Sequence, residues 1–307
     1  MQSDPEGNEE KGKKNRSFAP RALSIDLEVD KKDSRVFKLA AVRGDTGEAL
    51  LANGPQQIEQ ALNRLEAFAE GLTFLIGHNL LAFDAPQLRA LEPDLSILSL
   101  PMVDTLRLNP LAFPRNPYHR LVKHYQDGAL QGGQLNDPEL DSRLVLELFA
   151  DQWQALKTTH ETNPELVAGW HWLTTQERSP TGIGAFFTTI RNRVRPQAAE
   201  AKRAILDFLA ERACLKHAAC LLDSDLEDGW PLAFALAWIS VAGGNSVMPP
   251  WVLYQFPEAA RIVRRLRAES CSDAACAWCS ERHDAQRELT RWFGFPAYRP
   301  EPVDAEG

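Results

Sequence analysis

The run LSIDLEVD at residues 23–30 places carboxylates inside an otherwise apolar segment. In an extended strand, side chains alternate between two faces, so Asp26 and Glu28 share one face while Ile25 and Leu27 share the other. Two carboxylates side by side repel each other, and a divalent cation between them relieves that repulsion. Mg²⁺ and Mn²⁺ prefer such hard oxygen ligands. A half-solvated strand whose polar face looks at water is the alternative interpretation.

Further carboxylates stand where a metal site could recruit them. Asn79 and Asp84 follow an apolar strand predicted over residues 72–79, and in open α/β sheets sites gather at the carboxyl ends of strands. Asp141 lies in the first turns of a long helix predicted over residues 137–160. Taken singly, Asp84 is a plausible helix N-cap, and Asp141 is an acid favoured by the helix dipole.

Taken together, Asp26-x-Glu28, GHN followed by Asp84, and Asp141 resemble the motifs of DEDD-type 3′–5′ exonucleases, in the same order. The resemblance covers about residues 20–158. It implies a ribonuclease H-like fold and phosphodiester hydrolysis with two Mg²⁺ or Mn²⁺ ions. It also implies that Asp26 bridges both ions, that Glu28 and Asp141 hold the ion that activates water, and that Asp84 serves the second ion.

The usual general base of this family is replaced. Asn136 stands where one subclass has histidine, and Asp137 stands where another has tyrosine. Water could then be activated by metal alone, by Asp137, or by His119 or His124 in a helix predicted over residues 116–126. Two functions stay open: a DNA exonuclease, and a catalytically weak or inactive nucleic-acid-binding module, or structural adaptor, that keeps the fold.

A second group of candidate metal ligands lies near the C-terminus and has the spacing C-x4-C-x2-C-x3-H: Cys271, Cys276, Cys279 and His283. Thiolates at such spacing bind Zn²⁺ or an iron–sulfur cluster. His283 makes zinc the simpler prediction. An iron–sulfur cluster would need a distant fourth thiolate from Cys214 or Cys220. Ordinary thiols near a helix end are the third interpretation.

Basic residues supply candidates for contact with phosphates. Arg191 and Arg193 lie in the run RNRVRP, and Arg264 and Arg265 lie in a predicted arginine-rich helix. With Asn79 near the carboxylates, these residues are the predicted nucleic-acid contacts. A solvated surface is the alternative for each arginine.

Hydrophobic periodicity and breaks divide the chain into four parts. Residues 1–19 are predicted to be a disordered leader, and residues 20–158 an α/β domain with a mixed sheet and flanking helices. Residues 159–255 are predicted to be mainly helical. Residues 256–307 hold the arginine-rich helix, the cysteine-rich metal knuckle and a run, FGFPAYRP, that resembles the motif opening the core of RecQ-type helicases. No phosphate-binding loop of the G-x-x-x-x-G-K-[ST] type occurs, so a helicase motor is expected only in a longer protein.

Bulk composition is that of a soluble globular chain of about two domains, with 307 residues, 44% hydrophobic residues and a net charge of −8. No apolar run reaches the length of a membrane span, and no signal-peptide core precedes residue 20. We therefore expect a cytoplasmic, DNA-processing protein whose partner is DNA with a free 3′ end, with no membrane partner.

Overall fold

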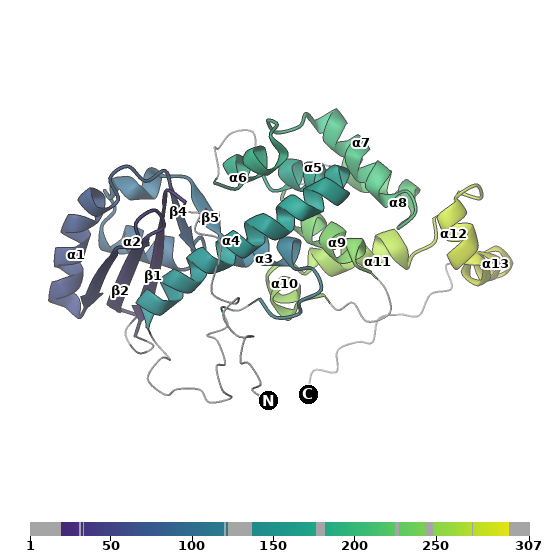
Figure 1. Ribbon diagram of the computed structural model, residues 1–307. Coiled ribbons are helices and arrows are strands. Elements are labelled where there is room, and N and C mark those ends of the chain that lie inside the picture. The colour runs from purple at the N-terminus through teal and green to yellow at the C-terminus, as the bar shows by residue number, and fades with distance from the viewer. Residues whose placement is uncertain are drawn as a thin grey trace, which may run out of the picture. The chain divides into compact units, whose positions relative to one another are not determined.

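The structure is a computed structural model that describes residues 20–30, 32, 34–119, 121, 137–175, 182–224, 227–242, 248–271 and 273–294 (Figure 1). The predicted leader, His124 and Asn136 lie outside these ranges. So does the helicase-like run, apart from Phe293 and Gly294.

The chain divides into two compact units. One contains the residues up to Arg107 together with Arg120–Gln152, and the other contains Leu108–His119 together with the residues from Trp153 onward. Helix α4 (Pro138–Thr162) contributes to both units. The domain boundary predicted near residue 158 therefore falls inside this helix.

The first unit is built on a mixed sheet with strand order β3-β2-β1-β4-β5. The bounds are β1 Ala22–Val29, β2 Val36–Arg43, β3 Ala49–Asn53, β4 Phe74–Gly77 and β5 Met102–Asp104. The first three strands form an antiparallel meander, whereas β4 pairs in parallel with β1, and β5 in parallel with β4. The predicted α/β class with a mixed sheet is confirmed.

Strand β1 is central, and helices cover both of its faces (Figure 1). Leu23, Ile25 and Leu27 are buried in a core shared with α1 (Pro55–Phe68) and α2 (Asp84–Leu91). The opposite face carries Ser24, Asp26 and Glu28, and the first part of α4 lies over it. Each fully buried leucine or isoleucine stabilises the sheet by about 1.5–3 kcal/mol. The alternation of side chains along β1 thus separates the core from a polar face.

The segment after α2 contributes a short strand, β5, and then continues directly into a helix. A 3₁₀ turn (Ser96–Ser99) precedes β5, which ends at Asp104, and α3 (Thr105–Ala112) starts at the next residue. The cause is local, since the Asp104 carboxylate accepts a hydrogen bond from the Leu106 amide at 3.0 Å and caps the new helix. In the described part of residues 116–126, the predicted helix does not form.

Every described element that lies wholly in the second unit is a helix. The bounds are α5 Pro164–Leu173, α6 Gly182–Arg191, α7 Ala198–Leu209, α8 Leu215–Asp223, α9 Trp230–Ser240, α10 Pro250–Gln255, α11 Glu258–Arg267, α12 Ala277–Arg282 and α13 Asp284–Phe293. Helix α9 is buried on nearly all sides, and the Trp170 indole of α5 donates to the Ala233 carbonyl at 3.0 Å. An all-round apolar helix of this kind forms the centre of a helical core.

Within the described residues, no helix combines the length and the apolar character that crossing a bilayer requires.

Candidate metal centres

Asp26 and Glu28 of β1 and Asp141 of α4 form an acidic cluster in the first unit. Each offers a carboxylate oxygen, and these oxygens all lie within 4.8 Å of one another. All three residues are partly exposed. The structure therefore brings together three of the four carboxylates that the sequence predicted to share a site.

The start of α4 places Asp141 in this cluster. Asp137 caps the helix, because its Oδ1 accepts hydrogen bonds from the amides of Glu139 and Leu140 at 3.2 and 3.3 Å. The Asp141 amide in turn donates to the Asp137 carbonyl at 3.0 Å. Asp137, which the sequence offered as a general base, thus has a structural task that fixes the first turn of α4.

Asp84 lies beside the cluster but outside the group of three. Its Oδ1 accepts a hydrogen bond from the Leu27 amide at 3.0 Å, and the residue is only 2% exposed. The β1–β4 ladder extends only to the Ser24–Ile76 pair, so the Asp84 carboxylate takes the place of a strand partner for Leu27. Asp84, predicted to serve a second ion, is thus not among the three carboxylates that meet, and one of its oxygens binds the backbone between Asp26 and Glu28.

Burial raises the pKa of the Asp84 carboxyl from 3.8 to about 7. The hydrogen bond from Leu27 opposes this shift, whereas the negative charges of Asp104 and Glu28 add to it. Without a cation nearby, Asp84 is therefore half protonated near neutral pH. Because two neighbouring carboxylates contribute to the shift, a positive charge bound at the cluster would lower this pKa.

Asp104, at the end of β5, is a positioning residue that was not among the predicted site residues. Its buried carboxylate accepts hydrogen bonds from the amides of Asn79, Leu81 and Leu106, at 2.9, 3.1 and 3.0 Å. Burial raises the pKa of Asp104, and these amides oppose the rise. Asn79, predicted to contact nucleic acid, has a φ of 73°, a left-handed conformation that asparagine tolerates. Asp104 thereby holds the loop that leads into Asp84.

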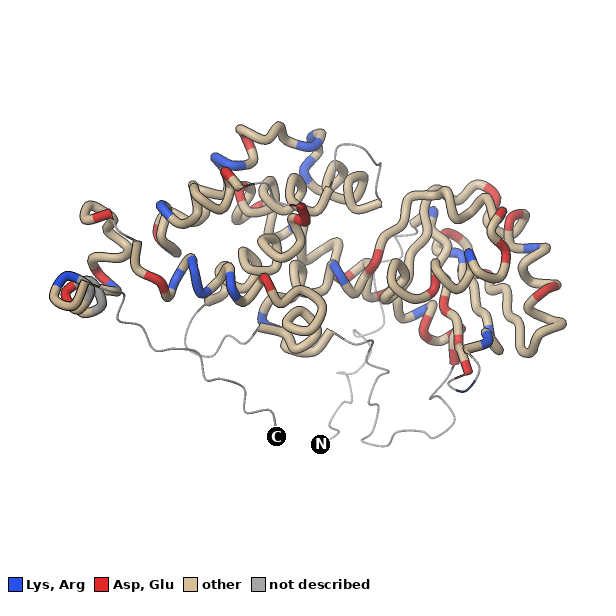
Figure 2. The backbone as a smooth tube through the Cα atoms, turned by 180° about the vertical axis from the view of Figure 1, so that it is seen from behind, with Lys and Arg blue, Asp and Glu red and all other residues tan. Residues whose placement is uncertain are grey.

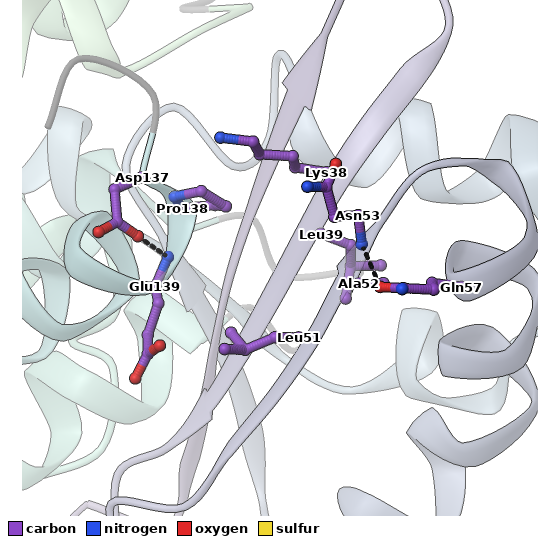
Figure 3. A pocket seen from close by; sticks show the side chains of 9 residues that line it. All are labelled: Lys38, Leu39, Leu51, Ala52, Asn53, Gln57, Asp137, Pro138 and Glu139. Atoms are coloured by element: carbon purple, nitrogen blue, oxygen red, sulfur yellow. Dashed lines mark hydrogen bonds between the residues drawn. The ribbon is translucent and has the colours of Figure 1, made fainter. Parts of the chain in front are cut away.

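A small cavity of about 190 Å³ is lined by residues of β2, β3, α1 and the start of α4 (Figure 3). Its lining consists of Lys38, Leu39, Leu51, Ala52, Asn53, Gln57, Asp137, Pro138 and Glu139. Lys38 pairs with Glu28 in the β1–β2 register, and Figure 3 shows it extending toward Asp137. Ligand pockets commonly reach about 300–1,000 Å³. The cavity is therefore too small for a nucleotide. The register of β1 and β2 places the Lys38 side chain on the same sheet face as Glu28 of the acidic cluster.

The predicted nucleic-acid contacts of α6 and its following turn divide into one buried and one exposed arginine. Arg191 is buried, and its Nη1 donates to the Val194 carbonyl at 3.1 Å and lies 3.0 Å from His171 Nδ1. Burial, followed by the charge of Arg191, lowers the pKa of His171 to about 4, so a neutral imidazole accepts from the guanidinium. The prediction for Arg191 is corrected, because a buried side chain cannot meet a phosphate. Arg193 is exposed.

Figure 2 shows basic residues following one another along α11. Arg265 is exposed, whereas Arg264 is partly buried and has its Nε 3.5 Å from a Glu269 carboxylate oxygen. The two arginines that the sequence grouped together thus differ in their surroundings. Of these two arginines, Arg265 is the more exposed.

The second candidate centre is a thiol cluster formed by Cys214, Cys271, Cys276 and Cys279, whose Sγ atoms all lie within 4.8 Å of one another. His283, predicted as the fourth ligand, instead directs Nε2 to the Arg267 carbonyl at 3.1 Å. Cys220 is exposed, and none of the five cysteines forms a disulfide. The prediction of His283 is therefore corrected to Cys214, which the sequence had offered only for the iron–sulfur alternative.

No family profile, curated protein sequence or solved structure matches this chain. Its function must therefore be inferred from the chemistry of the two centres. The oxygen donors of the acidic cluster suit a hard cation such as Mg²⁺ or Mn²⁺, whereas the sulfur donors of the thiol cluster suit a softer one.

Proposed function

We propose that the first unit is a metal-dependent 3′–5′ exonuclease domain with a ribonuclease H-like fold. Its substrate is DNA with a free 3′ end. The observation that carries this proposal is the acidic cluster: Asp26, Glu28 and Asp141 come from a central strand and a distant helix, yet their carboxylate oxygens meet within 4.8 Å. An antiparallel meander that continues into two parallel strands also agrees with the sheet expected for such a fold.

The residues of the cluster fit a divalent cation. They supply carboxylate oxygens only, they are partly exposed to solvent, and they repel one another without a positive charge. When bound, Mg²⁺ or Mn²⁺ ions would supply Lewis-acid chemistry that favours water as a nucleophile and stabilises the leaving 3′-oxygen. Asp26, Glu28 and Asp141 would hold the ions.

Asp84 has a different part in this proposal. By accepting the Leu27 amide, it fixes the backbone between Asp26 and Glu28 and so fixes the spacing of these two carboxylates. Asp104 orders the loop before it. Both are positioning residues of the site. Because Asp137 caps α4, we do not assign it as the general base.

The burial of Asp84 favours a second candidate function. Asp84 is 2% exposed with a pKa of about 7, so near neutral pH it adds only part of a negative charge to the three carboxylates of the acidic cluster. A chain that holds one ion weakly would bind nucleic acid without cutting it. The second candidate is therefore a catalytically weak nucleic-acid-binding module of the same fold.

A labelled-DNA assay on the full chain separates the two candidates. Single-stranded DNA carrying a 5′ label is incubated with the protein and Mn²⁺ or Mg²⁺, and an exonuclease yields a ladder of products shortened from the 3′ end. The Asp26→Asn variant should reduce the rate at least about 10²-fold, comparable with the loss of one transition-state contact. Asp94→Asn, which changes an exposed acid on the same unit, should leave the ladder intact.

Other outcomes of this assay have definite meanings. Binding of DNA without shortening supports the weak module. If the chain neither binds nor shortens DNA, both candidates are contradicted and the structural adaptor remains. A ladder that persists in Asp26→Asn contradicts the assignment of the acidic cluster as the active site.

A further inference from the structure

We infer that Cys214, Cys271, Cys276 and Cys279 bind one structural zinc ion, with Cys214 rather than His283 completing the site. Cys214 immediately precedes α8, and the other three cysteines come from the segment between α11 and α12 together with the first turns of α12. This inference concerns the second unit and is independent of the proposed nuclease activity.

The distances between the sulfur atoms favour a single ion. All four Sγ atoms lie within 4.8 Å of one another, and Cys214 and Cys276 have their sulfurs 3.8 Å apart. Four thiolates at about 2.3 Å from a tetrahedral Zn²⁺ have neighbouring sulfurs about 3.8 Å apart. An iron–sulfur cluster distributes its cysteines over separate iron atoms, which holds the thiolates farther apart. The iron–sulfur alternative therefore fits this geometry less well than zinc does.

The surroundings of the sulfurs also suit thiolate ligands. The Cys271 amide donates to the Cys279 sulfur at 3.4 Å, and such N–H···S bonds stabilise negative charge on sulfur. The Cys214 amide donates to the Leu266 carbonyl at 2.9 Å, which fixes this cysteine against the last turn of α11. Cys214 and Cys279 are fully buried, so no open coordination position faces solvent there. A closed set of four protein ligands is typical of a structural zinc site, not a catalytic one.

Positive charge lies next to the thiol cluster. Trp278 packs with these cysteines, and the guanidinium groups of Arg267 and Arg282 lie 5.4 and 3.9 Å from its ring centroid. Zinc with four thiolates carries a net negative charge, which nearby arginines offset. Cation–π attraction holds both arginines at Trp278, which brings their positive charge to the residue that packs on these cysteines. The arrangement is therefore compatible with a negatively charged complex at the thiol cluster.

The position of His283 gives the inference its sharpest test. His283 is close in sequence to Cys279, and its amide donates to the Cys279 carbonyl. Its ring, however, is turned to the Arg267 carbonyl. Sequence spacing made His283 the simpler fourth ligand and offered Cys214 only for the iron–sulfur alternative, whereas the structure groups Cys214, and not His283, with the other three cysteines.

The test is metal analysis of the purified full chain. We expect about one zinc per chain and a colourless protein. Cys214→Ser should weaken zinc retention at least about 100-fold, since even residues that merely orient ligands contribute 10–100-fold. The matched control Cys220→Ser changes the exposed cysteine of the same helix, and it should retain zinc, as should His283→Ala. Asp26→Asn should also retain zinc, which excludes the acidic cluster as the source.

A second measurement covers the possibility that Cys214→Ser does not fold. Co²⁺ is substituted into the wild-type chain, and its absorption spectrum reports the ligand set directly. Strong thiolate-to-cobalt charge transfer with the d–d bands of a tetrahedral four-sulfur site supports the inference. A three-sulfur, one-nitrogen spectrum, a brown iron-containing protein, absence of zinc from the wild type, or loss of zinc only in His283→Ala would each overturn it.

Discussion

The Asp84→Asn substitution should remove a pH dependence of stability that the wild-type chain shows without divalent cations. Asp84 is buried, and its carboxyl pKa is raised from 3.8 to about 7 by that burial. The folded state therefore binds this proton more tightly than the unfolded state does. The resulting stabilisation is complete below about pH 4 and is lost as the pH rises through 7. Asparagine does not ionise, and its Oδ1 can still accept the Leu27 amide.

The magnitude follows from the two pKa values. A rise from 3.8 to about 7 spans roughly 3.2 units, and at about 1.4 kcal/mol per unit this amounts to about 4 kcal/mol in total. Between pH 5 and pH 8 about 2.5 kcal/mol of this is lost, because the unfolded carboxyl is already ionised at pH 5 whereas the folded one ionises above pH 6. Saturating Mn²⁺ should reduce the loss, since a cation at the acidic cluster favours ionised Asp84.

The assay must report on the first unit. All eight tryptophans lie at residue 153 or later, so tryptophan fluorescence follows the second unit instead. Hydrogen exchange of peptides covering β1, measured with a chelator at pH 5 and pH 8, gives the opening free energy of the strand that Asp84 holds. Asp94→Asn is the control at an exposed acid. If wild type and Asp84→Asn lost the same free energy between the two pH values, the buried-carboxyl reasoning would be refuted.

Four further outcomes are expected. Asp104→Ala should lower the opening free energy of the first unit by about 3 kcal/mol, measured by hydrogen exchange of peptides covering β4 and β5, because three amides lose their acceptor. Glu28→Gln should reduce DNA shortening at least about 10²-fold in the ladder assay, since it removes one of the three carboxylates of the acidic cluster. Arg191→Met should lower the thermal midpoint, whereas Arg193→Ala should change stability by less than about 0.5 kcal/mol. Acidification from pH 7.5 to 5.5 should release zinc to a metal-sensitive dye, because protons compete for the thiolates.

The core and the pairing of Asp26 with Glu28 could be predicted because they depend on local periodicity. Side-chain direction in a strand repeats every two residues. The run LSIDLEVD alone therefore indicates which side chains face the core and which share the polar face. The same holds for α4, whose start follows from an aspartate before Pro138 and whose first turn then carries Asp141. Local rules of this kind require no knowledge of the rest of the fold.

Other features depend on contacts between distant segments, and no local pattern specifies them. Cys214 precedes Cys271 by more than 50 residues, and only the packing of α8 against α11 brings it to the thiol cluster. Asp104 has no unusual neighbours in the sequence, yet the amides of Asn79 and Leu81 reach it because β4 and β5 end side by side. Arg191 lies in a basic run and is nevertheless buried against His171. In each case tertiary packing decides the role of a residue whose type alone allowed several.

Both candidate centres have features that let them form before a cation arrives. At the acidic cluster, Lys38 stands opposite Glu28 in the β1–β2 register, and Asp84 remains largely protonated below pH 7, so repulsion is reduced in the empty site. At the thiol cluster, burial raises the pKa of Cys214 and of Cys279 and so favours their protonated forms without metal, whereas the pKa of Cys271 is lowered because its hydrogen bonds outweigh its burial. Metal binding must then displace protons at both places, and affinity at both should rise with pH. The chain can thus fold around its carboxylates and thiols first and exchange protons for metal afterwards.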